Sequence, residues 1–296
     1  MTGKLVLHLG AHKTATTAIQ HYCSEEKDRL RAAGIVYVGH TVKPFSTYRT
    51  LRDLTQEARG EGKFEFREAR SKLVIDNAEK VINRADVRSL LIPWEIFLGE
   101  PYDKNLPVLY PGAHLSLKAL AGFLKDLPIS IVFTIRDQWA FLNSWYLQLH
   151  KLGQIPDPTH FREWVAAANL SWRPMVETMK EYFGAENVTV LTYPANSATQ
   201  PDYFRDLFKA YGYVDPINPN SIDRKNESWP SEAMEIARHV MPLLPNDRER
   251  YLFRLKMDDV FSKLPGRQYK VLDESAQLQL AEKYAAENTT LGTSSK

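Results

Sequence analysis

The feature that most constrains this chain is a series of short apolar runs, separated by long stretches with helical periodicity. The runs are rich in β-branched residues, which is typical of buried strands. Tens of residues lie between most of them, enough for the helical crossovers that connect parallel strands. We therefore predict an α/β fold with a central parallel sheet of about five strands. The predicted strands are residues 5–9, 34–38, 89–94, 129–135 and 188–193.

The segments between the runs carry apolar residues three and four positions apart, the spacing that forms one face of a helix. After about residue 212 no strong strand pattern occurs, so the C-terminal part is expected to be helical and to pack on the sheet. We expect a single domain over residues 1–296, with a frayed polar tail at 289–296. The predicted helices are 14–32, 64–84, 113–125, 138–151, 160–170, 174–183, 202–211, 230–264 and 274–290.

Charge and cysteine content narrow the classes of protein and site. The chain has 38 Lys and Arg residues against 36 Asp and Glu, a net charge of +2, which lacks the strongly basic field of a nucleic-acid-binding protein. A single cysteine, Cys23, excludes an internal disulfide and a cysteine-rich zinc site. No signal-peptide pattern and no run of about 18 apolar residues occurs. We expect a cytoplasmic protein without a transmembrane segment; nothing in the sequence specifies its oligomeric state.

The first predicted strand leads into a turn that is suited to bind an anion. Gly10 ends the strand, and a helix is expected to begin within a few residues. A helix N-terminus presents unpaired N–H groups and the positive end of the dipole, and a lysine and threonine hydroxyls add donors. The turn differs from a Walker A loop, because Thr16 stands where that loop has its lysine. The alternative is an ordinary helix start capped by Thr14. The candidate residues are Gly10, Ala11, His12, Lys13, Thr14, Ala15, Thr16 and Thr17.

Further polar side chains are predicted at the same edge of the sheet, where ligands of parallel sheets bind. Arg136 follows the fourth strand, and Ser144 lies about two turns into the next helix. An arginine fork and a serine hydroxyl could together hold one phosphate. Glu95 follows the third strand and is our candidate general base for an acceptor hydroxyl. The ordinary alternatives are ion pairs for Arg136 and Glu95 and a surface position for Ser144.

The segment His8–Thr17, HLGAHKTATT, resembles the 5′-phosphosulfate loop of the sulfotransferases that use 3′-phosphoadenosine 5′-phosphosulfate (PAPS). It is especially similar to the bacterial pattern His-x-Gly-x-His-Lys-Thr-Gly-Thr-Thr, although Ala15 stands where that pattern has glycine. Arg136 and Ser144 have the spacing of the family's 3′-phosphate element. The resemblance implies a P-loop-type three-layer fold, PAPS as co-substrate and no metal.

The same resemblance implies roles for residues elsewhere in the chain. Lys13 would stabilise the leaving phosphate, and His12 would bind phosphate or order the turn. The family uses a histidine or a glutamate as base, and Glu95 has the position of that glutamate in bacterial members. Tyr193 would lie near the nucleotide, and Arg224 and Lys225 could reach its 3′-phosphate, with a solvated loop as the alternative for this basic pair.

The function that the resemblance implies is transfer of a sulfuryl group from PAPS to an acceptor hydroxyl or amine, with release of adenosine 3′,5′-bisphosphate. The expected acceptor is a glycan, a lipid-linked sugar or a small metabolite. One alternative is a P-loop kinase that uses Mg-ATP, in which Glu95 would bind the metal. Another is a non-catalytic nucleotide- or glycan-binding protein on the same fold. Magnesium dependence separates the first alternative from sulfuryl transfer, and turnover separates the second.

Overall fold

The computed structural model describes residues 3–39, 46–62, 67–214, 217–218, 222, 229–261 and 269–292. Its centre is a five-stranded sheet with the order β2-β3-β1-β4-β5, and each neighbouring pair is parallel. The predicted α/β class is confirmed, and every strand overlaps a predicted run. The strands are β1 (Lys4–His8), β2 (Ile35–Tyr37), β3 (Ser89–Pro93), β4 (Ile129–Ile135) and β5 (Val188–Thr192).

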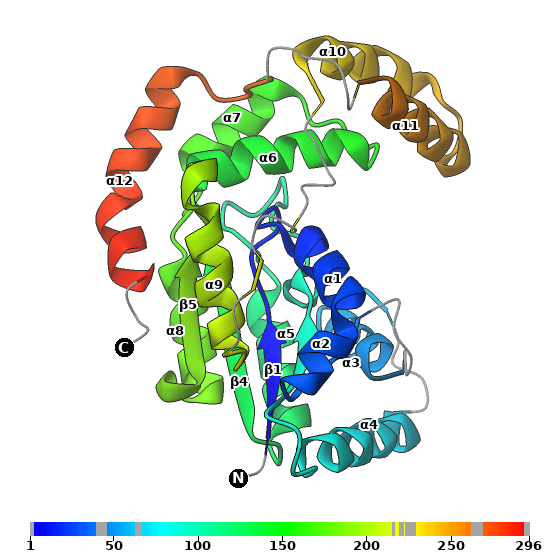
Figure 1. Ribbon diagram of the computed structural model, residues 1–296. Helices are drawn as coiled ribbons and strands as arrows, with labels where there is room; N and C mark the ends of the chain where they lie inside the picture. Colours follow the sequence, from blue (N-terminus) through cyan, green and yellow to red (C-terminus); the bar gives the residue numbers. More distant parts are fainter. Residues whose placement is uncertain are drawn as a thin grey trace.

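Helices cover both faces of the sheet because side chains on successive strand residues point to opposite faces. On β1, Val6 belongs to a buried cluster with α1, α2 and α9, whereas Leu5 and Leu7 belong to a larger cluster on the other face. Figure 1 views the molecule from the side of α1, α2 and α9. These helices are α1 (Thr16–Glu25), α2 (Lys27–Ala32) and α9 (Gln200–Ala210). The larger cluster on the other face includes residues of α3 (Ser46–Ala58), α4 (Arg67–Ile82), α5 (Ala113–Leu124) and α8 (Arg173–Phe183).

The carboxyl ends of the central strands lie at one edge of the sheet. His8, the last residue of β1, is level with Pro93 on β3 and Val132 on β4. Helix α6 (Gln138–Lys151) begins just after β4, and with α7 (Pro158–Ala167) it lies above this edge in Figure 1. Segments that are distant in the sequence therefore meet at the ends of β1, β3 and β4.

The C-terminal helices differ from the prediction in two places. Residues 230–261, the described part of the helix predicted over 230–264, form two helices, α10 (Ser231–Val240) and α11 (Asp247–Phe261). Pro242 and Pro245 interrupt the helical hydrogen bonds between them. Residues 289–292, which we expected in a frayed tail, instead form the last turn of α12 (Glu274–Gly292). That turn is held because Leu291 is buried and α12 packs along α6, where Asn288 Nδ2 donates to Gln138 Oε1 at 2.9 Å.

One helix, α3, was not predicted. Its buried face contains Tyr48, Leu51 and Leu54, but also the buried threonines Thr50 and Thr55. Polar residues at core positions hide the apolar periodicity on which the prediction depends. Within the described ranges, none of the helices combines the length and apolar character needed to cross a bilayer.

Candidate active site

The turn after β1 is tied into the sheet before it leads into α1. The backbone N–H groups of Leu9 and Ala11 donate to the carbonyls of Val132 and Thr134, both at 2.9 Å. These bonds extend the pairing of β1 with β4 beyond the strand itself. The chain then turns over a few residues and enters α1 at Thr16, so the N-terminus of this helix faces the carboxyl edge of the sheet.

Tight backbone geometry explains the small residues in the turn. A Cβ atom at Gly10 would lie 2.8 Å from His8 Nε2 and 3.0 Å from Thr14 Oγ1, so glycine is required for this close approach. Ala15 has φ 63°, in the left-handed region, which costs a non-glycine residue about 1–2 kcal/mol. The glycine of the sulfotransferase pattern would adopt this conformation without that cost.

The three threonines of the turn have different environments. Thr14 Oγ1 donates to the Ala11 carbonyl at 2.6 Å and closes the turn. The alternative of a helix capped by Thr14 is wrong, because α1 begins at Thr16 and Ala15 occupies the N-cap position. Thr16 Oγ1 is buried without a hydrogen-bond partner among the described residues, and Thr17 is exposed.

Lys13 lies in a cluster of positive charge. Its Nζ donates to Gln148 Oε1 at 3.3 Å. Burial, followed by repulsion from Lys151 and Arg136, lowers the pKa of Lys13 to about 8, while Glu95 acts in the opposite direction. A partly buried lysine whose nearby charges are mostly positive is stabilised when an anion binds beside it. The environment of Lys13 therefore favours an anionic ligand.

Arg136 connects the end of β4 to the turn. Its Nη1 donates to the Lys13 carbonyl at 2.9 Å, and its guanidinium carbon lies 5.4 Å from the centre of the Tyr193 ring. Gln200 Nε2 donates to the Tyr193 hydroxyl at 2.8 Å and fixes that ring. The structure thus brings together Arg136, Lys13 and Tyr193, three of the residues that the sequence singled out.

Helix α6 presents two polar side chains toward this region. Ser144 is partly exposed and lies one turn before Gln148, so the two residues share a face of the helix. Because Gln148 contacts Lys13, that face borders the turn. Gln148 was not among the predicted site residues; its position one turn after Ser144 was the signal that could have identified it.

His12 is held by a tyrosine from a distant loop. The backbone N–H of His12 donates to the Tyr110 hydroxyl at 2.8 Å, and His12 Nδ1 lies 2.9 Å from the same oxygen. The imidazole packs edge-on against Trp145, with 4.9 Å between ring centres. Burial, with a smaller contribution from Lys13, lowers the pKa of His12 to about 3, so the imidazole is neutral near pH 7.

Tyr110 itself has an uncommon backbone conformation, with φ 51°. A tyrosine in this region costs about 1–2 kcal/mol, which the surrounding structure must offset. Tyr110 is buried, and burial raises the pKa of its hydroxyl well above the usual range, so it is a neutral phenol. It is 98 residues from His12 in the sequence, and no local pattern connects the two.

Glu95 begins the short helix η1 (Glu95–Leu98), just after β3. Its Oε2 is buried without a hydrogen-bond partner among the described residues. Burial raises the pKa of Glu95, while its own backbone N–H and the positive charge of Lys13 act in the opposite direction. The result is a carboxyl near the turn that holds its proton more tightly than usual.

Three further residues that the sequence analysis assigned to the site are Ala11, Arg224 and Lys225. Ala11 is buried in the turn, and Arg224 and Lys225 lie outside the described residues.

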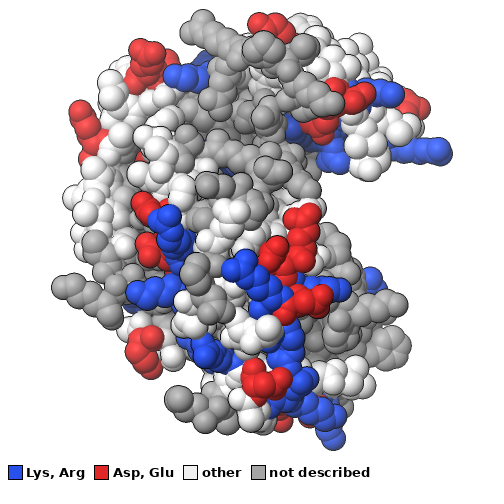
Figure 2. All heavy atoms as spheres, in the orientation of Figure 1, with Lys and Arg blue, Asp and Glu red and all other residues white. Residues whose placement is uncertain are grey.

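Figure 2 shows positive and negative side chains mixed over one face, with a recess on its right side below α11. Among the side chains that Figure 2 colours, neither sign of charge forms a broad field. Within the described part of the chain, no three His, Cys, Asp or Glu side chains gather as a metal site would require.

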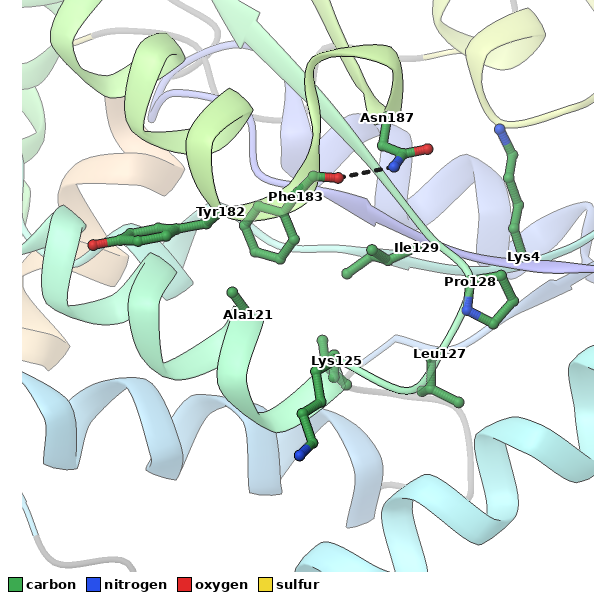
Figure 3. Close-up of a pocket in the computed structure, with 10 residues that line it drawn as sticks. Lys4, Ala121, Lys125, Leu127, Pro128, Ile129, Tyr182, Phe183 and Asn187 are labelled. Carbon is green, nitrogen blue, oxygen red and sulfur yellow. Dashed lines mark hydrogen bonds between the residues drawn. The ribbon is translucent and has the colours of Figure 1, made fainter.

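Two hollows are lined by residues outside the charged turn. One of about 420 Å³ is lined by Lys4, Leu127 and Phe183 and lies at the opposite edge of the sheet, where β1 and β4 begin. Figure 3 shows its lining, including the hydrogen bond from Asn187 to the Phe183 carbonyl. A second hollow of about 250 Å³ lies beside Tyr110. Neither contains Lys13, Arg136 or Glu95 in its lining.

The chain was compared with known protein families, curated proteins and solved structures. No family model matches the sequence, and no curated protein matches it. The fold is similar to that of a sulfotransferase from Alicyclobacillus acidocaldarius, with 15% sequence identity and a TM-score of 0.43. The match covers 86% of this chain and 97% of that one.

Proposed function

We propose that this chain is a sulfotransferase that uses PAPS and releases adenosine 3′,5′-bisphosphate. The observation that carries the proposal is the convergence of Lys13 and Arg136 at the carboxyl edge of β1 and β4, with the Lys13 pKa lowered in part by positive neighbours. Such a site gains stability from a polyanion. We propose an acceptor that bears a hydroxyl or amine, such as a glycan, a lipid-linked sugar or a small metabolite.

The donors of the site fit a nucleotide with phosphate groups at two positions. Lys13 and the N-terminus of α1 would hold the 5′-phosphate side and stabilise the negative charge that develops on the leaving group. Arg136, together with Ser144, would hold the 3′-phosphate. Tyr193, beside Arg136, offers a ring near the nucleotide. PAPS would supply the sulfuryl group, and this donor set requires no metal.

Glu95 is proposed as the base that takes the proton of the acceptor. Its carboxyl follows β3 at the same edge, and Lys13 is close enough to act on its pKa. A carboxyl whose pKa is raised toward the working pH is a better base than an ordinary one. Its Oε2 is buried without a hydrogen-bond partner among the described residues, so this oxygen would gain a hydrogen bond where an acceptor hydroxyl reaches it.

The proposal is tested by calorimetry of nucleotide binding without magnesium. We expect adenosine 3′,5′-bisphosphate to bind more tightly than ADP or ATP, and Arg136→Ala to remove that preference. Lys13→Ala should weaken all three nucleotides, whereas Lys125→Ala, an exposed lysine near the opposite edge of the sheet, should change none. Tighter binding of ATP, or binding only with magnesium, would support the kinase alternative and refute the proposal.

Binding without turnover would indicate the non-catalytic alternative. We would therefore follow conversion of PAPS to adenosine 3′,5′-bisphosphate with a panel of glycans, lipid-linked sugars and small hydroxyl or amine compounds. Release that depends on one acceptor class, and that is lost in Glu95→Gln, supports sulfuryl transfer to that class. Failure of the whole panel with intact nucleotide binding would contradict the enzymatic part of the proposal.

A further inference from the structure

The Tyr110 hydroxyl makes two hydrogen bonds to one residue, His12, and the direction of the second bond decides where the tyrosine proton lies. The backbone N–H of His12 can only donate, so at this contact the tyrosine oxygen accepts, at 2.8 Å. The second contact, at 2.9 Å, joins the same oxygen to His12 Nδ1. A phenol has one proton and a neutral imidazole nitrogen can either donate or accept. The second bond therefore has two possible directions.

Burial distinguishes between these directions. If Nδ1 donated, the tyrosine oxygen would accept twice and its own proton would need another acceptor. Within the described ranges the Tyr110 hydroxyl bonds only to these two atoms of His12, and Tyr110 is buried. A buried hydroxyl proton without an acceptor is costly. The arrangement that satisfies every group has the Tyr110 O–H donating to Nδ1, which places the imidazole proton on Nε2.

We propose that Tyr110 is a positioning residue that holds His12 as the Nε2–H tautomer, so that this imidazole donates a hydrogen bond to an anionic oxygen at the turn. Nε2 makes no hydrogen bond to any residue in the described part of the chain, so it is left for a ligand. Trp145 packs against the ring and restrains its rotation. The low pKa of His12 is consistent with this neutral form. The identity of the anion rests on the proposed function. The assignment of the tautomer is independent of the proposed function.

This assignment separates the roles of two candidate catalytic groups. A histidine that carries its proton on Nε2 and accepts at Nδ1 has no free lone pair with which to take a proton from an acceptor. His12 is therefore a donor to the leaving group, and Glu95 is left as the base. The strained backbone of Tyr110 fits this view, because strain of this kind persists where a fixed side-chain position is needed.

The test is nuclear magnetic resonance of the imidazole nitrogens in the full ¹⁵N-labelled chain near pH 7. His12→Gln identifies the His12 signals among the eight histidines. We expect the parent chain to show Nε2 protonated and Nδ1 unprotonated. Tyr110→Phe should change this to a mixture or to the Nδ1–H form. Tyr102→Phe removes a hydroxyl from the same loop, for which no hydrogen bond exists within the described residues, and should leave His12 unchanged.

Binding provides the second readout. Tyr110→Phe should weaken adenosine 3′,5′-bisphosphate about tenfold, as expected for loss of one oriented hydrogen bond to a charged group. His12→Gln should bind better than His12→Asn, because the longer amide can place its nitrogen where Nε2–H lies. This comparison keeps the test informative if Tyr110→Phe does not fold.

The inference is overturned if the parent chain shows His12 in the Nδ1–H form, or if a folded Tyr110→Phe keeps the parent tautomer. It is also overturned if His12→Asn binds as well as His12→Gln. If the expected tautomer is found and the nucleotide does not bind to the parent chain, the proposed function fails while the assignment of Tyr110 stands.

Discussion

We expect replacement of Ala15 by glycine to make the protein more stable, although glycine destabilises a helix when it lies in the interior. Ala15 has φ 63° and ψ 19° and precedes the first residue of α1. An L-residue with a Cβ atom in this region is disfavoured, whereas glycine adopts it readily. The substitution therefore removes strain from the folded state without requiring any movement of the turn.

The expected change in the free energy of unfolding is the sum of one favourable and two unfavourable contributions. Relief of the left-handed conformation contributes about 1–2 kcal/mol. The greater conformational freedom of glycine in the unfolded chain destabilises the folded state by about 0.5–1 kcal/mol. The methyl group of Ala15 is only partly buried against the α1 cluster, so its loss costs less than the ~0.8 kcal/mol of a fully buried group. The free energy of unfolding should rise by about 0.5 kcal/mol, or about 1 °C in Tm for a chain of this length.

The assay is differential scanning calorimetry with a matched control. Ala18→Gly makes the same chemical change one turn later, where Ala18 is helical and buried, so it should lower stability by about 1 kcal/mol or more. The two variants are therefore expected to change the stability in opposite directions. If Ala15→Gly lowers Tm as Ala18→Gly does, Ala15 is not held in the left-handed region and the account of the turn is wrong.

Three other outcomes are expected. Raising the pH from 7 to 9 should weaken nucleotide binding, since Lys13 loses its proton near its pKa of about 8. Calorimetry across this range should show a nucleotide affinity that does not change with pH for Lys13→Arg, because arginine stays charged. Arg136→Gln removes the hydrogen bond to the Lys13 carbonyl and should lower the free energy of unfolding by about 1.5–3 kcal/mol; a change below about 0.5 kcal/mol in denaturant unfolding would show that this bond does not hold the turn. Glu95→Gln should preserve nucleotide binding and reduce PAPS turnover about 10²–10⁴-fold. The pKa of Glu95 is raised in the folded protein, so ionisation of Glu95 lowers the free energy of unfolding as the pH rises above the ordinary carboxyl range. Glu95→Gln should therefore keep or raise Tm at pH 7. A clearly lower Tm would contradict the direction of the pKa shift.

The sequence by itself determined the sheet and the edge at which the site lies. Strands that are buried on both faces read as continuous apolar runs, and this signal is local. Parallel strands joined by crossovers end at a common edge, so the residues that follow them come together without knowledge of any single contact. This is why Lys13, Glu95 and Arg136 could be grouped in advance. Helix α3 was not predicted, because threonines occupy part of its buried face.

Only the tertiary structure decided how these residues are held. The positive φ values of Lys13 and Ala15 depend on pairing of the turn with β4, which lies more than a hundred residues away. The lowered pKa of Lys13 depends on burial and on charges from other elements, and the tautomer of His12 depends on a tyrosine from a distant loop. Periodicity reports which face of an element is buried, but it contains no information about which distant side chain lies within hydrogen-bond distance, because that is set by packing of the whole fold.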